Sequence, residues 1–261
     1  FMNSISANLN LMIKASEKAS KILIRDFGEI ENLQIQSKNI GDFVTNADLK
    51  SEKILIDTLK YYYPDATYLS EEAGEIKGNE EKIIIDPIDG TTNFIHGIPM
   101  IGIVISKIIK EEITDGIIYN PITNDFFWAS KGKGAWCNNK RMRVSKRESI
   151  EECLIGTGIP HANNIYKNYL DEINEIALST AGIRRMGSAA LDLAYVAAGK
   201  LDAFWERNLN IWDVSTGVLL VKEAGGKVTQ PQGKTWDIYS RDILVSNSLI
   251  HEKIQEKLTK V

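Results

Sequence analysis

The first quarter of the chain contains two stretches in which apolar side chains recur at the spacing of a helix. Over residues 3–27, apolar positions fall near i, i+3, i+4 and i+7. A second stretch begins after Thr45, whose spacing to Asp48 is that of a capping box with Asp in place of Glu, and it ends at Pro64. We therefore expect two helices here, joined by a polar loop.

Beyond Pro64 the chain is dense in Ile, Val, Phe and Trp and is punctuated by turn residues, a pattern typical of short strands. We place these strands at 67–70, 82–86, 101–109, 113–119 and 125–130. After residue 150, apolar runs alternate with segments of helical period, which predicts strands at 152–157, 183–186, 202–206, 226–229 and 242–246 and helices at 164–180, 188–198, 213–224 and 248–260. The order of elements indicates a layered α/β (α+β) fold in a single domain, 1–261, with closely packed halves at approximately 1–150 and 151–261.

The segment from Ile83 to Phe94 carries the strongest chemical signal. Three consecutive isoleucines indicate a strand that is buried on both faces, because a half-exposed strand would alternate apolar with polar residues. The run stops at Asp86 and Asp89, with a turn around them. Two carboxylates at the end of a buried strand repel each other and are costly to desolvate, so a cation is expected between them. Oxygen ligands of this kind suit Mg²⁺.

Composition and charge exclude several classes of protein. The formal net charge of -4 argues against non-specific binding to nucleic acid. No apolar run approaches the roughly 18 residues that a membrane span needs, and no signal peptide is evident. Cys137 and Cys153 are too few for a disulfide framework or a zinc site. We therefore expect a cytoplasmic protein that does not bind membranes.

Two further acids and one turn stand near the predicted site in sequence. Glu71 follows the strand at 67–70, and Asp213 opens a helix. Each has a plain alternative, because Glu71 suits a solvated loop and Asp213 suits the first turn of a helix. Gly90 and Thr91 follow Asp89 in a turn that can hold a phosphate. The order Asp-x-x-Asp-Gly-Thr also differs from the Asp-x-Asp order of phosphatases with an aspartyl nucleophile.

These motifs resemble those of the inositol monophosphatase family, in the family's order and over nearly the whole chain. The segments that carry the resemblance are Asp86-Pro-Ile-Asp-Gly-Thr-Thr-Asn-Phe94, Ser70-Glu-Glu72, Trp212-Asp213, Glu223-Ala-Gly-Gly226, Phe43-Val-Thr-Asn-Ala-Asp48 and Met186-Gly-Ser-Ala-Ala190. The resemblance implies a layered αβαβα sandwich and Mg²⁺-dependent hydrolysis of small phosphate monoesters. It also implies inhibition by lithium and a homodimer.

The resemblance further implies a set of site residues. Two Mg²⁺ ions, with a third and weaker one leaning on Glu71, would be held by Glu71, Asp86, the Ile88 carbonyl, Asp89 and Asp213, with Asp86 bridging. The catalytic residues would be Thr91, Asp48 and Glu71, the first two orienting and deprotonating the attacking water. The substrate would contact Asp89, Gly90, Thr91, Gly187, Ser188, Ala189, Glu206 and Asp213. Lys38 is either a loop lysine near the metals or a solvated one, and no role is assigned to His96.

The leading interpretation is a phosphatase acting on myo-inositol monophosphate. Fructose 1,6-bisphosphate, histidinol phosphate and 3′-phosphoadenosine 5′-phosphate remain alternative substrates, since phosphate and metals supply most of the binding. An alternative of another class is a regulatory protein that binds RNA or the transcription machinery. Its motivating feature is the basic run Lys140, Arg141, Arg143, Lys146 and Arg147. Such a run is more often a solvated turn.

Overall fold

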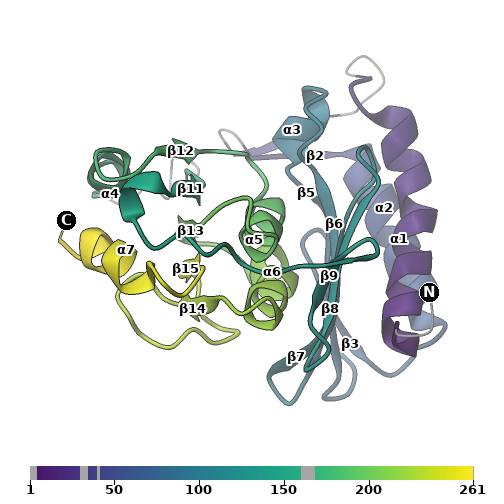
Figure 1. The fold of residues 1–261 in the computed structure, drawn as a ribbon. Coiled ribbons are helices and arrows are strands. Elements are labelled where there is room, and N and C mark those ends of the chain that lie inside the picture. Colours follow the sequence, from purple (N-terminus) through teal and green to yellow (C-terminus); the bar gives the residue numbers. More distant parts are fainter. Residues whose placement is uncertain (1–4, 30–34, 40–41, 160–167, 261) are drawn as a thin grey trace.

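The computed structural model describes residues 5–29, 35–39, 42–159 and 168–260, which stack in five layers (Figure 1). Helices α1 (Ala7–Asp26) and α2 (Asn46–Lys60) form the first layer, next to an eight-stranded sheet. Helices α5 (Ala189–Ala197) and α6 (Ile211–Glu223) separate that sheet from a five-stranded one. Helices α4 (Tyr169–Ala177) and α7 (His251–Leu258) cover the outer face of the smaller sheet. The predicted αβαβα sandwich is thus confirmed.

The large sheet is antiparallel except for one parallel pair, β3 with β5. Its strands, in spatial order, are β10 (Lys140–Arg141), β9 (Ala135–Cys137), β8 (Asp125–Ser130), β7 (Glu112–Asn120), β6 (Gly102–Ile109), β5 (Lys82–Asp89), β3 (Thr67–Ser70) and β4 (Gly74–Ile76). Strand β5 lies inside the sheet, with α2 on one face and α6 on the other. Residues 83–89 are all buried, which confirms the expectation drawn from the isoleucine run.

The small sheet is mixed, with parallel pairs around β11 and antiparallel pairs around β15. Its spatial order is β12 (Gly182–Arg184), β11 (Leu154–Thr157), β13 (Ala203–Glu206), β15 (Ile243–Ser246) and β14 (Lys227–Thr229). A 3₁₀ turn, Ile150–Glu152, precedes β11. The two sheets come from separate parts of the chain, and the single-domain assignment with a division near residue 150 stays a prediction.

Capping interactions define the start of α2 as the sequence predicts. Thr45 is the N-cap and its hydroxyl accepts the N–H groups of Ala47 and Asp48, while Asp48 accepts the N–H of Thr45. This reciprocal pair satisfies N–H groups that have no partner within the helix. The first turn of α2 is thereby fixed beside the end of β5.

Several predicted elements differ from the structure. The polar loop expected before α2 is wrong, because β1 (Ile35–Asn39) and β2 (Asp42–Thr45) pair antiparallel, and Lys38 lies in β1. Helix α6 begins at Ile211, so Asp213 is its third residue rather than its opening one. The short strands β4, β9 and β10 were not predicted, since two or three residues cannot display a period. Part of the predicted helix 164–180 lies outside the described residues.

None of the helices that the structure describes is both long and apolar enough to cross a membrane.

We predict that Gly217→Ala destabilises the protein even though alanine favours helices. Gly217 lies in α6, where an added Cβ would stand 2.5 Å from the Cβ of Leu193 in α5. The helix preference of alanine is worth about 1 kcal/mol, whereas overpacking a tight interface typically costs about 1–3 kcal/mol. We therefore expect the free energy of unfolding, measured by urea titration, to fall by about 1–2 kcal/mol.

A matched control is Lys53→Ala, which places alanine at an exposed position of α2. This control should change the free energy of unfolding by less than about 0.5 kcal/mol. A Gly217→Ala variant more stable than the wild type would contradict the close packing of α5 on α6.

Candidate active site

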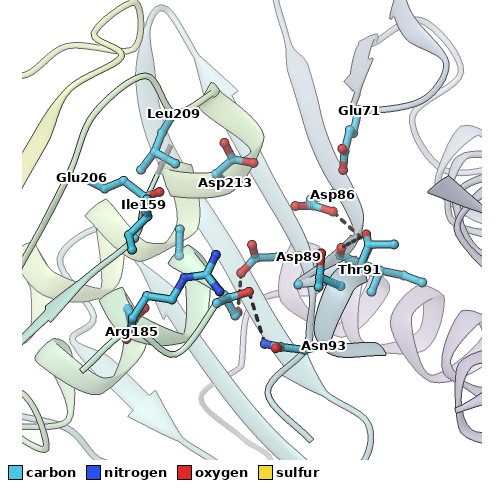
Figure 2. Close-up of a pocket in the computed structure, with 18 residues that line it drawn as sticks. Glu71, Asp86, Asp89, Thr91, Asn93, Ile159, Arg185, Glu206, Leu209 and Asp213 are labelled. Carbon is cyan, nitrogen blue, oxygen red and sulfur yellow. Dashed lines mark hydrogen bonds between the residues drawn. The ribbon is translucent and has the colours of Figure 1, made fainter. Parts of the chain in front are cut away.

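A cavity of about 180 Å³ opens where the end of β5 meets α3 (Thr91–Ile95), α5, α6 and the end of β13. Figure 2 shows side chains from both halves of the chain converging on it. The residues expected from the sequence that line it are Glu71, Asp86, Ile88, Asp89, Gly90, Thr91, Gly187, Ser188, Ala189, Glu206 and Asp213. Asp48 does not line the cavity but contacts Thr91 from behind. The structure thus brings together residues that lie far apart in sequence.

Asp86 and Asp89 stand at an irregularity of strand β5. The pairing of β5 with β6 shifts between these two residues, where Pro87 and Ile88 intervene. Asp86 is 1% exposed, and its Oδ1 accepts the N–H of Ile88 at 2.9 Å. The tight local bond holds the Asp86 carboxylate at the cavity wall.

Asp89 is anchored by the N-terminus of α5. Its Oδ2 accepts the Ser188 hydroxyl at 2.5 Å and the N–H of Ala190 at 2.8 Å, and Ser188 is the N-cap of that helix. Burial raises the pKa of Asp89 to about 6, although these hydrogen bonds favour the ionised form. The contact joins the end of β5 to the second half of the chain.

Asp213 and Asp48 occupy equivalent positions in two different helices. Each is the third residue of its helix and accepts the N–H of the residue before the helix, Asn210 in α6 at 2.6 Å and Thr45 in α2 at 2.9 Å. The alternative considered for Asp213, a first-turn helix acid, is therefore right about its backbone contact. The same side chain also lines the cavity, so the two interpretations are compatible.

A common arrangement follows for Asp86, Asp89 and Asp213. Each carboxylate accepts a backbone N–H: Oδ1 of Asp86 from Ile88, Oδ2 of Asp89 from Ala190 and Oδ2 of Asp213 from Asn210. Such a hydrogen bond orients the carboxylate before a ligand binds, so less conformational freedom is lost on binding.

The electrostatics of the cavity favour a cation. Burial, followed by repulsion from Glu71, Asp89 and Asp213, raises the pKa of Asp86 well above its usual range. Burial and the charge of Asp89 also raise the pKa of Asp213 well above its usual range. Buried carboxylates that repel one another are stabilised by a hard cation such as Mg²⁺, so this donor set fits that ion.

Thr91 links the cavity to Asp48. Its hydroxyl lies 3.1 Å from Asp48 Oδ1 and 3.1 Å from the carbonyl oxygen of Ile88, so a single proton has two acceptors. Burial raises the pKa of Asp48 to about 6, against the hydrogen bonds from Thr45 and Thr91. Gly90 precedes Thr91 with φ of +97°, a conformation that glycine adopts readily, and an added Cβ would meet the Met100 carbonyl at 2.8 Å.

Glu206 and Asp192 form the far wall. Burial, with a contribution from Asp89, raises the pKa of Glu206 to about 8, and Arg185 opposes the shift. The Glu206 carboxyl lies against Gly158, where an added Cβ would stand 2.0 Å from it. Asp192 is 1% exposed, and its Oδ1 has no hydrogen-bond partner in the described part of the chain.

Sequence reasoning missed seven residues that line the cavity: Thr92, Asn93, Gly158, Ile159, Arg185, Asp192 and Leu209. Asn93 lies inside a quoted motif, and its amide donates to the carbonyls of Met100 and Met186 at 2.8 and 2.9 Å. Arg185 directly precedes another motif. Gly158 and Asp192 carry no local signal, because only the packing of β11 and α5 brings them to the wall. His96 is exposed and does not line the cavity.

Within the described ranges, no three acidic, histidine or cysteine side chains form a closed cluster around one point. The carboxylates are instead spread over the wall of the cavity (Figure 2).

Comparisons with known proteins identify the family of this chain. An inositol-1-monophosphatase of Caulobacter vibrioides is 46% identical over 95% of this chain and 99% of its own length. The Nus factor SuhB of Pseudomonas aeruginosa is 39% identical over 92% of this chain and 91% of its own length. The crystal structure of the extragenic suppressor protein suhB from Bartonella henselae superposes with a TM-score of 0.94 at 45% identity, covering 98% of this chain and 99% of that one. Residues 6–261 match the model of the inositol monophosphatase family, and the chain belongs to that family.

Proposed function

We propose that this protein hydrolyses a small phosphate monoester in a Mg²⁺-dependent reaction, with myo-inositol monophosphate as the leading substrate. Family membership supports a phosphatase. The observation that supports the metal dependence is the set of carboxylates at the cavity, three of which are oriented by a backbone N–H.

The metal-binding residues follow from the donor set. We assign Mg²⁺ to Glu71, Asp86, the Ile88 carbonyl, Asp89 and Asp213, with two ions and a weaker third near Glu71. When bound, Mg²⁺ supplies a more acidic water and neutralises the charge that develops on the phosphoryl oxygens. The carboxylate oxygens that are already bonded to backbone N–H groups keep the ligands oriented.

Thr91 and Asp48 would remove the proton from the attacking water. The Thr91 hydroxyl lies 3.1 Å from Asp48 Oδ1, so it can donate to that carboxylate while accepting from water. With a pKa of about 6, Asp48 is mainly ionised near neutral pH and can receive the proton. Glu71 lines the same wall and completes the catalytic group.

The substrate would lie between the phosphate turn and the far wall. The backbone of Gly90 and Thr91 would contact the phosphate. The hydroxyl groups of the alcohol would meet Asp89, Gly187, Ser188, Ala189, Glu206 and Asp213. The names of the relatives support inositol phosphate, whereas fructose 1,6-bisphosphate and histidinol phosphate share the required chemistry. A homodimer, lithium inhibition and a cytoplasmic location stay predictions.

A second candidate function is binding to RNA. Relatives such as that of Pseudomonas aeruginosa are named Nus factors. Arg141 and Arg143 are exposed here, and the guanidinium carbon of Arg141 lies 5.9 Å from the Trp136 ring centroid, an arrangement on which a base could stack. Against it, Arg147 of the same basic run is bonded to Asp202 at 3.0 Å and therefore serves the fold. Phosphate hydrolysis has the stronger support.

We predict that Asp86→Asn and Asp89→Asn each lower phosphate release more than about a hundredfold, because each removes a negatively charged ligand. The measurement is phosphate release with Mg²⁺ or EDTA from inositol 1-phosphate, fructose 1,6-bisphosphate, histidinol phosphate and 3′-phosphoadenosine 5′-phosphate. The wild type should release phosphate with Mg²⁺ only, and the preferred compound identifies the substrate.

The control for these variants is Asp57→Asn, at an exposed position of α2 that does not line the cavity. It should retain the wild-type rate. Near-normal turnover in Asp86→Asn or Asp89→Asn would contradict the metal assignment. No release by the wild type from any of the four compounds would contradict the proposed hydrolysis.

We predict that Thr91→Ala lowers kcat by about ten- to a thousandfold and changes KM little, because the hydroxyl acts on the water rather than on the substrate. Steady-state kinetics with the preferred substrate give both constants. Thr91→Ser restores the hydroxyl and should recover most of kcat. A large rise in KM with an unchanged kcat would instead assign Thr91 to substrate binding.

For the second candidate, we predict RNA binding that weakens as salt rises and is lost when Arg141 and Arg143 are both changed to Gln. Filter binding at several salt concentrations measures it. Asp86→Asn should bind RNA like the wild type, because the basic surface and the cavity are separate. Binding that persists in the double variant would exclude this surface.

A further inference from the structure

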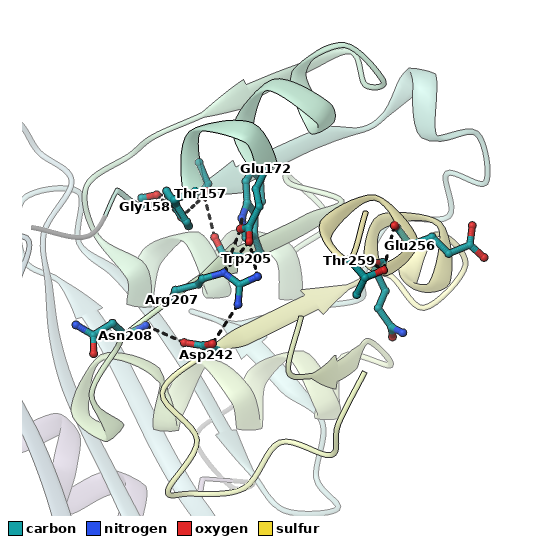
Figure 3. Close-up of polar contacts among 11 residues, drawn as sticks. Thr157, Gly158, Glu172, Trp205, Arg207, Asn208, Asp242, Glu256 and Thr259 are labelled. Carbon is teal, nitrogen blue, oxygen red and sulfur yellow. Dashed lines mark hydrogen bonds and ion pairs between the residues drawn. The ribbon is translucent and has the colours of Figure 1, made fainter. Parts of the chain in front are cut away.

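Glu206 lines the cavity from the last position of β13. Its two sequence neighbours, Trp205 and Arg207, extend towards Glu172 of α4 (Figure 3). Trp205 is fully buried and Arg207 is 8% exposed. This alternation is the ordinary consequence of a strand, in which successive side chains point to opposite faces. The position of Glu206 therefore depends on what holds Trp205 and Arg207.

Both neighbours donate to the same carboxylate, that of Glu172 in α4. The indole N–H of Trp205 lies 3.1 Å from Glu172 Oε2. The Nε of Arg207 lies 2.8 Å from Oε1 and 3.1 Å from Oε2, and its Nη2 also donates to Oε1. Glu172 is 4% exposed, so these charge-assisted bonds are shielded from solvent. One buried carboxylate thus clamps the residues on either side of Glu206.

The same arginine fixes the chain that follows. Its Nη1 donates to Asp242 Oδ2 at 3.1 Å, and Asp242 Oδ1 accepts the N–H of Asn208 at 3.1 Å. The N–H of Leu209 bonds to the carbonyl of Arg241 at 2.8 Å. This connection carries the chain from Glu206 towards Asp213, and these hydrogen bonds help to fix its path.

The adjacent strand β11 is held from α4 as well. The Tyr169 hydroxyl of α4 donates to the carbonyl of Gly158 at 2.5 Å. The Thr157 hydroxyl of β11 donates to the carbonyl of Trp205 in β13 at 2.9 Å (Figure 3). The Glu206 carboxyl packs against the bare α-carbon of Gly158. Helix α4 therefore determines both the strand that bears Glu206 and the backbone against which Glu206 rests.

We propose that Glu172 is a positioning residue that sets the place of Glu206 in the cavity and thereby the binding of the alcohol part of the substrate. A buried ion pair is weak evidence for stability, because apolar residues of similar volume stabilise a core as well or better. The ion pair instead fixes geometry, because a bidentate contact with Glu172 allows one orientation of the Arg207 guanidinium. This inference rests on the proposed hydrolysis of a phosphorylated polyol.

The test is Glu172→Gln, which keeps the shape of the side chain and removes its charge. Loosening Glu206 weakens a hydrogen bond to the alcohol, so KM for inositol 1-phosphate should rise about five- to tenfold while kcat stays within about twofold. KM for p-nitrophenyl phosphate, which has no ring hydroxyl, should not change. The inhibition constant of inorganic phosphate should not change either.

A double-variant cycle tests whether Glu172 acts through Glu206. In a Glu206→Gln background, the added change Glu172→Gln should have no further effect on KM for inositol 1-phosphate. If the two changes raise KM independently, so that their fold-changes multiply in the double variant, the proposal is overturned. An equal rise of KM for both substrates would also overturn it, because a general loosening of the fold acts on both.

The matched control is Asp202→Asn at the opposite end of β13. Asp202 is fully buried and accepts Arg147 at 3.0 Å and the N–H of Leu154 at 2.7 Å, but it does not line the cavity. The Asp202→Asn variant should lower thermal stability and leave both KM values unchanged; a matching rise in KM would overturn the proposal.

If Glu172→Gln does not fold, Arg207→Lys replaces it as the test variant. This change loses the bidentate contact with Glu172, so the same rise in KM is expected. No hydrolysis by the wild type would overturn both the proposed function and this inference, whereas normal hydrolysis with an unmoved KM in the variants would overturn only the inference.

Discussion

The repulsion among carboxylates buried around one cavity is the constraint on which the rest of this structure depends. Asp86 and Asp89 come from the end of β5, Asp213 from the first turn of α6 and Glu71 from the segment after β3. Burial raises the pKa of the three aspartates, so their ionised forms are costly as long as only solvent and protein surround them. The fold must hold these groups together against their own repulsion, which a bound cation would offset.

Hydrogen bonds from backbone N–H groups hold the three aspartates in place. Ile88, Ala190 and Asn210 each donate to one of the three aspartates, and two of those donors lie at helix starts where N–H groups have no partner within the helix. The same bonds that end β5 and begin α5 and α6 therefore orient these carboxylates. Local stability and the geometry of the site come from one set of contacts, which explains why an acid in the first turn of a helix can serve both purposes.

The layered architecture brings the N-termini of α5 and α6 and the end of β5 together at the cavity. Helices α5 and α6 lie between the two sheets, so their N-termini face the end of β5 while the small sheet presents Glu206 from the other side (Figure 1). The outer helix α4 reaches the same wall indirectly, through Glu172 and the residues that flank Glu206. The two halves of the chain, which supply opposite walls of the cavity, are joined there by hydrogen bonds such as that from Ser188 to Asp89.

The sequence alone determined those features whose physical cause is local. The isoleucine run predicts the buried strand because burial on both faces requires consecutive apolar residues, and Thr45 with Asp48 predicts a helix start because capping acts over three residues. Only the tertiary structure decided the pairing of β1 with β2, the arrival of Gly158, Arg185 and Asp192 at the cavity, and the clamp of Glu172 on Trp205 and Arg207. These features depend on contacts between segments far apart in the chain, and the sequence around a residue does not show which distant residue it will contact.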